Sequence, residues 1–522
     1  MLVFCDVIIF YPDLNKVQKY ENMPYCRTNK NVYLCKLSNV QNINIMSNNY
    51  NLKKVNLLIT LFICISSILN AQWISPGNGT TYTLTDLVDV TNGVVTNGPD
   101  GLLINADLTI SANDVLKIDN QVTRVDIDAI LITINGSMIC TNSNRVRFYG
   151  LNETNHFSMR FENATACNLK NMYFSDGAGI KVIESEVTFD DVKFVYFTTD
   201  YCHSAIDIFN CNPVIQNCYF LLNEGAAIGS PANGQSSPII LNCEFDSNVD
   251  GANIPQINLG PGAEDTIYIV GNLVDGTYAG FHTGGISIAD LMGTGDTKIL
   301  LKDNIIKRNR YGYNQQGYHL SSLIIGNEFL DNYHEDNPMN GGSGISIYGM
   351  DENNKAVIRD NVITGNLWGI TAINGFDIDL GTEDDWGHNE IHNNANSGVS
   401  YDLYNNSAYD IMAVGNDWGT TSEQEVEDHI VHQHDNSSYG LVTFIPFVGY
   451  DAVGEAEDAA FVVAPNPAQG RFTVEGKGKL TIVNTLGQTL LSKNINGQET
   501  IELPQGIYLV RLGNAVQKVL VR

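Results

Sequence analysis

Five basic residues and two tyrosines lie close together in an otherwise acidic part of the sequence. Residues 72–460 contain 15 Lys and Arg against 52 Asp and Glu, yet five of those cations fall within 13 positions. They are Lys298, Lys302, Lys307, Arg308 and Arg310, with Tyr311 and Tyr313 immediately after. β-Elimination of a uronic acid needs a cation beside the carboxylate and a base for the C5 proton. Lys307, Arg308 and Arg310 are therefore catalytic candidates, and His319 and His334 lie near enough in the sequence to supply the base.

Aromatic side chains recur at one position of a short repeat that is described below. Tyr311, His334 and Trp368 each lie seven residues after the start of a repeat copy. Exposed aromatic rings in one column suit the apolar faces of sugar rings. The sequence therefore predicts glycan contacts at Tyr311, Tyr313 and Trp368. The alternative is that these are ordinary turn side chains and that the basic cluster balances local acids.

Glu383, Asp384 and Asp385 are consecutive carboxylates. Ca²⁺ prefers carboxylate oxygens, so the run is a candidate metal site, with an acidic surface loop as the alternative. An Asp pair before Gly387-His388 superficially resembles the polygalacturonase-type hydrolases, but the order and spacing differ. No Gly-x-Ser-x-Gly, His-Glu-x-x-His or phosphate-binding loop motif occurs, and Ca²⁺ is the one cofactor that the sequence suggests.

A short motif recurs ten times and determines the expected architecture. Each copy has an apolar residue two positions after its start, and six copies have Asn five positions after it, as in NCYFLLN at 217–223. The mean period is 27 residues, with steps from 20 to 34. A fixed short core with variable spacing is typical of a solenoid whose turns carry loops of different length. We therefore expect each copy to form one coil.

Asparagine occupies the first position of most later copies. These residues are Asn272, Asn304, Asn327, Asn361, Asn389 and Asn416. Asn tolerates left-handed backbone geometry at sharp turns, and stacked Asn side chains can hydrogen-bond along a column. The sequence predicts a structural ladder at these positions.

The repeat resembles the right-handed parallel β-helix proteins of the pectate-lyase-like superfamily over roughly residues 82–420. The resemblance implies an all-β fold, a right-handed parallel β-helix solenoid over 72–420 that includes an N-terminal cap. AVGNDWGT at 413–420 is similar to a last coil, so residues 421–460 should form a C-terminal cap and an acidic linker. The superfamily includes lyases, hydrolases, epimerases, tail spikes and non-catalytic adhesins, so the resemblance implies a fold and leaves the function open.

Residues 461–522 differ in character and predict a small antiparallel β-sandwich. They contain Pro465-Asn466-Pro467 before Gly470, NTLGQ at 484–488, LPQGIYLVRL at 503–512 and a basic end. These features closely resemble the C-terminal sorting domain of the type IX (Por) secretion system. The resemblance implies the type IX machinery as a partner, and an extracellular or cell-surface location.

The N-terminal region has the pattern of a signal peptide. Lys53 and Lys54 precede a 13-residue apolar run from Leu57 to Leu69, and Ala71 is suited to cleavage. We expect a signal peptide at 46–71 and no transmembrane segment in the mature chain, because the run is short for a membrane span. Residues 1–45 fit no part of a signal, so a mis-assigned, unstructured start is expected there.

Charge and cysteine content narrow the partners. The net charge is −29 overall and −37 for residues 72–460, so a nucleic acid partner is not expected. Six cysteines follow Ala71, and they could pair in an exported protein or remain buried thiols. Cys218 and Cys243 occupy equivalent repeat positions.

Two functions follow from these patterns. The first is an exported protein that binds glycan or serves as a surface scaffold or adhesin. The alternative is a polysaccharide lyase or epimerase that acts on uronate-rich glycan in a groove near residues 298–370, and a glycoside hydrolase would be a third enzymatic form. No sequence motif decides between an enzyme and a binding protein.

Overall fold

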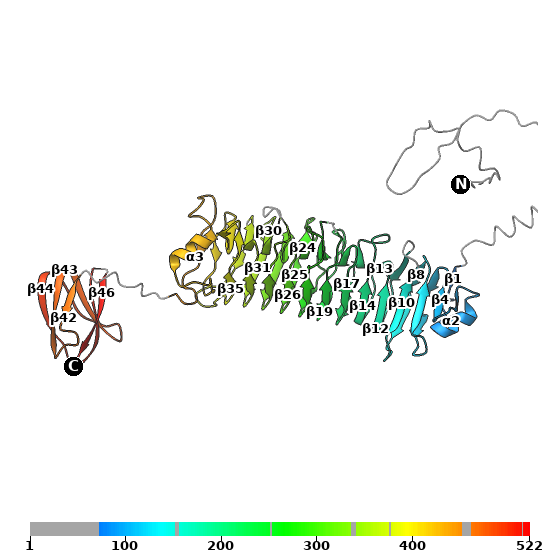
Figure 1. Ribbon diagram of the computed structural model, residues 1–522, viewed down its shortest axis with the longest axis horizontal. Helices are drawn as coiled ribbons and strands as arrows, with labels where there is room; N and C mark the ends of the chain where they lie inside the picture. The colour runs from blue at the N-terminus through cyan, green and yellow to red at the C-terminus, as the bar shows by residue number, and fades with distance from the viewer. Residues whose placement is uncertain are drawn as a thin grey trace, which may run out of the picture. The chain divides into compact units, whose positions relative to one another are not determined.

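The computed structural model describes residues 72–151, 156–250, 253–335, 341–374, 377–450, 461–513 and 515–522. The expected mis-assigned start, the signal peptide and the acidic linker at 451–460 lie outside these residues. Two separate hydrophobic cores are present, one within residues 84–447 and one within residues 461–521. Figure 1 shows the first part as a stack of coils, which confirms the right-handed parallel β-helix.

One side of the stack is a 14-stranded parallel sheet, here sheet A. Its strands in spatial order are β1 (Trp73–Ile74), β5 (Leu108–Ile110), β8 (Leu131–Ile134), β11 (Phe157–Glu162), β13 (Gly177–Ile183), β15 (Ser204–Phe209), β18 (Ala226–Gly229), β21 (Pro255–Leu259), β24 (Gly284–Asp290), β27 (Tyr313–Gly317), β30 (Ser343–Gly349), β33 (Trp368–Ile373), β38 (Leu403–Asn406) and β40 (Ile430–Val431).

A 25-stranded sheet forms the other sides as two ladders. Ladder B contains β2 (Thr81–Thr83), β6 (Val115–Ile118), β9 (Ser137–Cys140), the first halves of β12 (Cys167–Ser175) and β14 (Val187–Val195), β16 (Val214–Gln216), β19 (Ile239–Leu241), β22 (Thr266–Val270), β25 (Thr297–Lys302), β28 (Leu320–Ile325), β31 (Lys355–Arg359), β34 (Asp377–Asp379), β39 (Ile411–Met412) and β41 (Val442–Thr443). Ladder C contains β3 (Val95–Asn97), β4 (Leu102–Ile104), β7 (Arg124–Ile127), β10 (Val146–Gly150), the second halves of β12 and β14, β17 (Tyr219–Leu221), β20 (Glu244–Asp246), β23 (Leu273–Asp275), β26 (Ile305–Lys307), β29 (Glu328–Leu330), β32 (Val362–Thr364) and β35 (Glu390–His392).

Each coil passes from sheet A to ladder B, turns sharply into ladder C and returns to sheet A. The B–C corner carries the predicted asparagines, but the left-handed residue is the one before each of them. Asp303, Asp360 and His388 have φ of 54°, 56° and 51°. The ladder asparagines themselves do not have positive φ values. Their side chains are buried.

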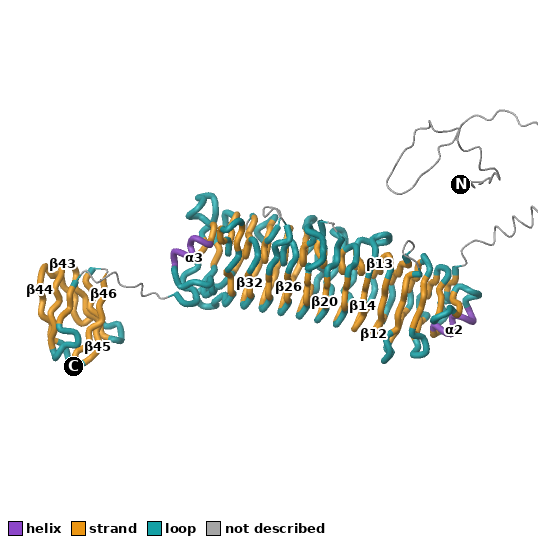
Figure 2. The backbone as a smooth tube through the Cα atoms, viewed as in Figure 1, coloured by secondary structure: helices purple, strands orange, loops and turns teal. Residues whose placement is uncertain are grey.

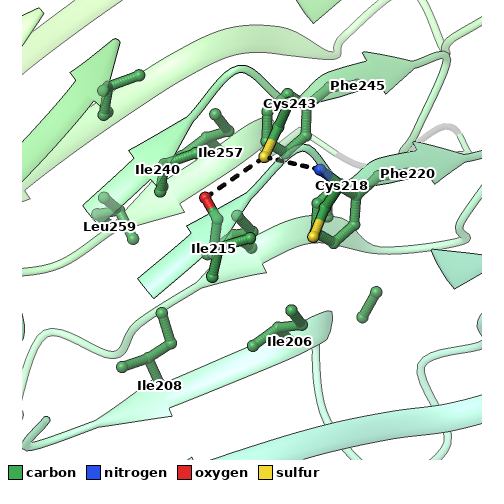
Figure 3. Close-up of a cluster of buried hydrophobic side chains, with 14 of the residues drawn as sticks. Ile206, Ile208, Ile215, Cys218, Phe220, Ile240, Cys243, Phe245, Ile257 and Leu259 are labelled. Atoms are coloured by element: carbon green, nitrogen blue, oxygen red, sulfur yellow. Dashed lines mark hydrogen bonds between the residues drawn. The ribbon is translucent and has the colours of Figure 1, made fainter. Parts of the chain in front are cut away.

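Apolar side chains of consecutive coils stack inside the helix. Phe194, Phe220 and Phe245 stack with ring centroids 4.8 and 4.9 Å apart, as Figure 3 shows for Phe220 and Phe245. All three are 0% exposed. Burying one such ring contributes roughly 1.5–3 kcal/mol, so the column is a main source of stability.

Short helices occur at the two ends of the coil stack (Figure 2). Helix α2 (Leu84–Val90) begins with a capping box between Thr83 and Asp86 and buries Leu84 and Leu87. Helix α3 (Glu423–His429) is capped by Ser422 and buries Val426. The buried residues of both helices belong to the core of the β-helix, so each helix covers apolar surface that an end coil would expose.

The C-terminal residues form a five-stranded antiparallel sheet. Its strands are β42 (Val462–Ala464), β43 (Arg471–Asn484), β44 (Thr489–Glu502), β45 (Gly506–Leu512) and β46 (Ala515–Val521). Strand β42 pairs with the first half of β43, and β45 pairs with the second half. Phe472 in the first half of β43 and Ile482 in the second half belong to the same core, so both halves of the long hairpin bury their apolar side chains together.

Candidate functional site

The outer face of sheet A presents one residue per coil in strict register. Strand side chains alternate between the core and solvent, and the parallel pairing aligns the outward ones into a column. The column runs through Arg160, Lys181, Asp207, Gly229, Asn258, Ser287, Asn314, Ser346, Thr371 and Tyr404. Its chemistry changes from charged to neutral along the stack, and two clefts lie over these two parts.

The first cleft, here the aromatic cleft, lies over β27, β30, β33 and β38 and has a volume of about 370 Å³. Its lining residues are Asn253, Arg310, Tyr311, Asn314, Gln316, Gly341, Ser343, Ser346, Trp368, Thr371, Ile373, Tyr404 and Asn406. Among the described residues, none of those that line this cleft is a carboxylate.

The aromatic rings of this cleft are in mutual contact. The Trp368 ring centroid lies 5.3 Å from that of Tyr404 in an edge-to-face arrangement, and 4.4 Å from that of Tyr401. The hydroxyl oxygens of Tyr404 and Tyr439 are 3.4 Å apart, and this hydrogen bond together with burial raises the pKa of Tyr404 to about 12. Burial likewise raises the pKa of Tyr311 to about 12. Both hydroxyls are therefore neutral at physiological pH and can donate or accept hydrogen bonds.

Arg310 is the cation of the aromatic cleft, and acidic and amide groups hold it in place. Its Nε lies 3.5 Å from the Glu335 carboxylate, and one terminal nitrogen donates to the Asn253 side-chain oxygen. The same Glu335 oxygen lies 3.1 Å from Nδ1 of His282. Because Glu335 is 7% exposed, water screens its charge little, and the carboxylate offsets charge of Arg310 at the cleft wall.

Amide and hydroxyl groups complete the wall of the aromatic cleft. The Asn314 side chain donates to Ser287 Oγ at 2.9 Å, and the hydroxyls of Ser343 and Thr371 are 2.9 Å apart. Asn, Ser and Thr side chains of this kind offer both donors and acceptors. The cleft therefore combines aromatic faces with neutral hydrogen-bonding groups.

The second cleft, here the acidic cleft, lies over β15, β18 and β21 on the same face and has a volume of about 460 Å³. Asp207, Glu224 and Asp250 line it together with His203. Burial raises the pKa of Asp207, with Lys181 and His203 acting in the opposite direction. Glu224 accepts hydrogen bonds from the backbone N–H of Thr199 at 3.0 Å and from its hydroxyl at 3.3 Å.

The structure separates the residues of the predicted basic cluster. Arg310 reaches the aromatic cleft, whereas Arg308 donates through Nε to Asp275 at 3.0 Å and Lys307 lies 3.7 Å from the same carboxylate. Lys298 donates to the Glu264 carbonyl and Lys302 lies 3.7 Å from Asp303. Lys307 and Arg308 therefore lie on ladder C and its corner, apart from Arg310, and the catalytic role of these three residues stays a prediction.

The two candidate bases are also apart. His319 follows β27, and its Nε2 lies 2.7 Å from Asp351, whereas His334 precedes β30. They therefore lie at opposite ends of adjacent strands of sheet A. Burial and nearby Arg308 lower the pKa of His334. Neither histidine lines the aromatic cleft.

The three residues that were predicted to contact glycan differ in where their side chains lie. Tyr311 and Trp368 both line the aromatic cleft. Tyr313 is 0% exposed and belongs to the core, so its predicted glycan contact is wrong. The reason is strand alternation: Tyr313 is the first residue of β27 and points inward, and Asn314 takes the outward position.

The acidic run at 383–385 is an exposed loop. The guanidinium of Arg359 is 2.9 Å from Asp385 and 2.7 Å from Asp379, and Arg359 is 6% exposed. Asp385 and Asp379 therefore offset the charge of a buried cation, and the metal site at Glu383, Asp384 and Asp385 stays a prediction. The loop forms the corner between β34 and β35.

The predicted asparagines lie in one column of buried side chains. Asn272, Asn304, Asn327, Asn361 and Asn389 each donate Nδ2–H to Oδ1 of the next coil's asparagine at 2.8–2.9 Å, and the chain ends at Asn416. The same Oδ1 atom also accepts the backbone N–H of the preceding coil, for example from Asn327 to Asn361 at 2.8 Å. We call this column the asparagine ladder.

A second column, at the corner between ladder C and sheet A, ends in a charge. Asn309, Asn332, Asn366 and Asn394 are linked in series, and Asn394 donates to the Asp402 carboxylate at 2.9 Å. The other oxygen of Asp402 lies 2.9 Å from Nδ1 of His429, which is the last residue of α3. This hydrogen bond raises the pKa of His429.

Six cysteines after Ala71 are free thiols in this structure. Cys218 and Cys243 precede the Asn column at equivalent positions, and the Cys243 sulfur accepts the backbone N–H of Cys218 at 3.4 Å (Figure 3). Cys243 in turn donates its backbone N–H to Asn272 Oδ1 at 2.8 Å. Burial raises the pKa of the Cys218 thiol well above its usual range. The Cys243 thiol therefore takes the acceptor position that an asparagine Oδ1 holds in the asparagine ladder, whereas the Cys218 thiol donates to the carbonyl oxygens of Phe189 and Gln216.

One group of described residues has metal-ligand types close together, namely Glu427, His432 and His434. Nδ1 of His432 accepts the backbone N–H of Val442 at 2.9 Å, and Nε2 lies 3.0 Å from Glu427. A neutral imidazole that accepts at Nδ1 carries its proton on Nε2 and cannot offer that nitrogen to a metal. The geometry therefore favours a hydrogen-bonded cap over a metal centre.

Two family models match parts of the chain. Residues 313–424 match a family described as a protein of unknown function (DUF1565), and residues 462–522 match the secretion system C-terminal sorting domain. No curated protein matches the chain. Similar solved structures include the periplasmic alginate epimerase AlgG, at 12% identity and a TM-score of 0.41 over 70% of this chain and 82% of that chain. A tailspike protein double mutant of E. coli bacteriophage HK620 with pentasaccharide has 12% identity and a TM-score of 0.34, over 91% and 90%.

The chain is a parallel β-helix protein with a sorting domain for the type IX secretion system. The domain implies export by that machinery to the cell surface or the extracellular space. No helix within the described residues has the length and apolar character needed to cross a bilayer.

Proposed function

We propose that this exported protein binds a neutral polysaccharide in the aromatic cleft on the outer face of sheet A. The observation that carries the proposal is the lining of the cleft: Trp368, Tyr311 and Tyr404 beside amide and hydroxyl groups, with no carboxylate among the described lining residues. Aromatic rings fit the apolar faces of sugars, and a few placed polar groups fix their orientation.

The repeat of the fold suits a polymer that lies along the stack. Adjacent strands of sheet A are about 4.8 Å apart, which is close to the length of one hexose unit. Asn314, Ser346, Thr371 and Tyr404 therefore offer one outward group per coil, in register. A chain crossing these four strands would meet a similar polar group at each sugar.

Charge favours a neutral ligand over a uronate-rich one. Residues 72–460 carry a net charge of −37, and Arg310, the cation in the cleft, is offset by Glu335. The lyase or epimerase alternative has less support, because Lys307 and Arg308 are engaged by Asp275 away from the cleft. A polyanion would therefore meet repulsion without a compensating site.

Calorimetric titration of the full chain tests this proposal. Neutral xylan and β-glucan oligosaccharides are compared with polygalacturonate and alginate oligosaccharides. We expect binding of at least one neutral glycan, and a loss of affinity of about tenfold or more in Trp368→Ala, in line with a buried aromatic anchor. Tyr268→Ala is the matched control, because Tyr268 is an exposed aromatic residue on ladder B.

The results separate the alternatives. Equal losses in both variants would show that the cleft is not the site. Tight binding of the uronate oligosaccharides alone would overturn the neutral-ligand proposal and restore the uronate alternative.

A second candidate function is glycan hydrolysis at the acidic cleft. Burial raises the pKa of Asp207, and a carboxyl group that retains its proton can act as a general acid beside a second carboxylate such as Glu224. Release of reducing ends from a bound neutral glycan measures this activity. Asp207→Asn should abolish it and leave binding in the aromatic cleft unchanged, and activity that persists in this variant would exclude Asp207 as the acid.

A further inference from the structure

The sorting domain presents an apolar strip on the outer face of its sheet. In β45, Tyr508, Val510 and Leu512 point into the core, whereas Ile507 and Leu509 are 40% and 42% exposed. These two exposed residues alternate with the buried ones, so they lie on one face of the strand.

Strand register extends this strip across three strands. Leu509 pairs with Val483 of β43 on one side and with Lys518 of β46 on the other. Ile507 pairs with Leu520, and Arg511 pairs with Val516. The outer strip is therefore defined as Val483, Ile507, Leu509, Arg511, Lys518 and Leu520, with apolar groups at its centre and two cations at its side.

Charge in the sorting domain is strongly segregated. Residues 476–498 and 503–522 contain six Lys and Arg and no Asp or Glu. The three acidic residues of the domain are Glu475, Glu499 and Glu502, and Glu499 is itself paired with Lys493. The strands of the outer strip thus form a cationic surface, in contrast to the acidic residues 72–460.

We propose that the outer strip is the surface by which the sorting domain docks onto a protein of the secretion machinery, and that the partner presents an apolar patch with an acidic rim. An apolar face rimmed by charge is typical of a protein interaction site. The family match of residues 462–522 to a secretion sorting domain shows that an export machinery is the relevant partner. The strip is independent of the glycan cleft.

A folded protein partner fits these observations better than an anionic bilayer. The cations of the strip are held at fixed register positions on paired strands, because Lys518 pairs directly with Leu509 and Arg511 follows Leu509 by two residues on the same face. Electrostatic adsorption to a bilayer needs no such register and gains only about 1 kcal/mol per Lys or Arg near the surface. Fixed geometry instead gives specificity for one complementary surface.

Export of the full chain from a bacterium with type IX secretion tests the proposal. The secreted fraction of Leu509→Asp is compared with that of Val462→Asp, whose parent side chain is 59% exposed on β42. We expect Leu509→Asp to reduce secretion at least tenfold and Val462→Asp to be secreted like the wild type. Equal secretion of both variants would overturn the proposal.

A second variant guards against a folding defect. The double substitution Arg511→Gln and Lys518→Gln leaves the core untouched and removes both cations of the strip, so it should also retain protein in the periplasm. Retained protein that resists protease as the wild type does would support a docking defect. Normal export of this variant, with protease-sensitive Leu509→Asp, would overturn the proposal.

Vesicles containing phosphatidylglycerol distinguish the bilayer alternative. We expect the full chain not to co-sediment with them beyond its level with neutral vesicles. Co-sedimentation that both variants lose in parallel with export would assign the strip to the membrane and overturn the protein partner.

Discussion

At the scale of single residues, each ladder asparagine serves three neighbours at once. Nδ2 of Asn327 donates to the Leu301 carbonyl and to Asn361 Oδ1, both at 2.9 Å. Its Oδ1 accepts the backbone N–H of Asn304 at 3.0 Å. These groups are buried, so water cannot replace a bond that is lost.

We therefore predict that Asn327→Ala strongly destabilises the β-helix. The substitution removes the acceptor of the buried Asn304 N–H and the side-chain donor to the Leu301 carbonyl, at a cost of about 1–3 kcal/mol for each unsatisfied group. The midpoint of urea unfolding, followed by circular dichroism, should fall clearly. Asn353→Ala, an exposed turn asparagine, is the control, and an equal change in both would contradict the ladder's role.

The pair of His429 and Asp402 predicts a pH dependence. The pKa of His429 is raised by its hydrogen bond to Asp402, so the folded protein binds this proton more tightly than the unfolded chain. The resulting stability is fully present below the unfolded pKa of about 6.5 and is lost as pH rises through the higher folded pKa.

Thermal unfolding of the wild type and His429→Gln measures this dependence. The stability difference between them should be largest near pH 5.5 and should shrink as the solution becomes alkaline. A difference that is constant over this range, or grows with pH, would show that the His429 proton does not contribute.

At the scale of elements, glycines set the close approach of coils where the chain enters sheet A. A Cβ on Gly312 would lie 2.4 Å from the carbonyl oxygen of Gly344, and one on Gly369 would lie 2.3 Å from that of Asp402. These are backbone contacts that no side-chain rearrangement can relieve. The coil spacing at this corner therefore depends on the missing side chain.

Gly312→Ala should accordingly lower the free energy of unfolding by about 1–3 kcal/mol, the usual cost of overpacking. Gly98→Ala is a suitable comparison, because its nearest contact would be 3.5 Å away. Hydrogen exchange at β27 and β30 would locate the damage. Unchanged protection there would contradict the assigned close contact.

The repeat motif predicted the B–C corner because one short turn of fixed length separates the two strands at that corner, as between β25 and β26. It could not predict the outward residues of sheet A, because loops of variable length lie between ladder C and that sheet. Thr371 follows Asn361 by ten residues, whereas Ser346 follows Asn327 by nineteen. The glycines carry the missing signal: Asn314, Ser346 and Thr371 each come two residues after Gly312, Gly344 and Gly369.

Closeness along the sequence also does not place the charged residues of this fold at one site. Lys307, Arg308 and Arg310 are neighbours along the chain, but they lie on either side of a corner, so only Arg310 faces the aromatic cleft. Asp207 and Glu224, by contrast, are 17 residues apart in sequence and line the same acidic cleft. In a solenoid, residues at matching positions of adjacent coils are close in space, whereas neighbours along one coil can lie on different sides of it.

At the scale of the whole molecule, like charges dominate residues 72–460. A net charge of −37 opposes compact folding through self-repulsion, and salt screens it. We predict that raising NaCl from about 10 mM to about 150 mM increases the melting temperature of the full chain, because the Debye length falls from about 30 Å to about 8 Å. A melting temperature that falls with salt would show that attractive ion pairs outweigh this repulsion.

The asparagine ladder also has a mechanical consequence. Each coil contacts mainly its two neighbouring coils, so a molecule pulled from its ends should unfold one coil at a time. A coil of about 27 residues at about 3.4 Å each would release about 90 Å of chain per step. A single-molecule force–extension curve would then show a series of similar force peaks. The coil at one end that is held by the hydrogen bonds of Asp402 and His429 should resist unfolding to a higher force.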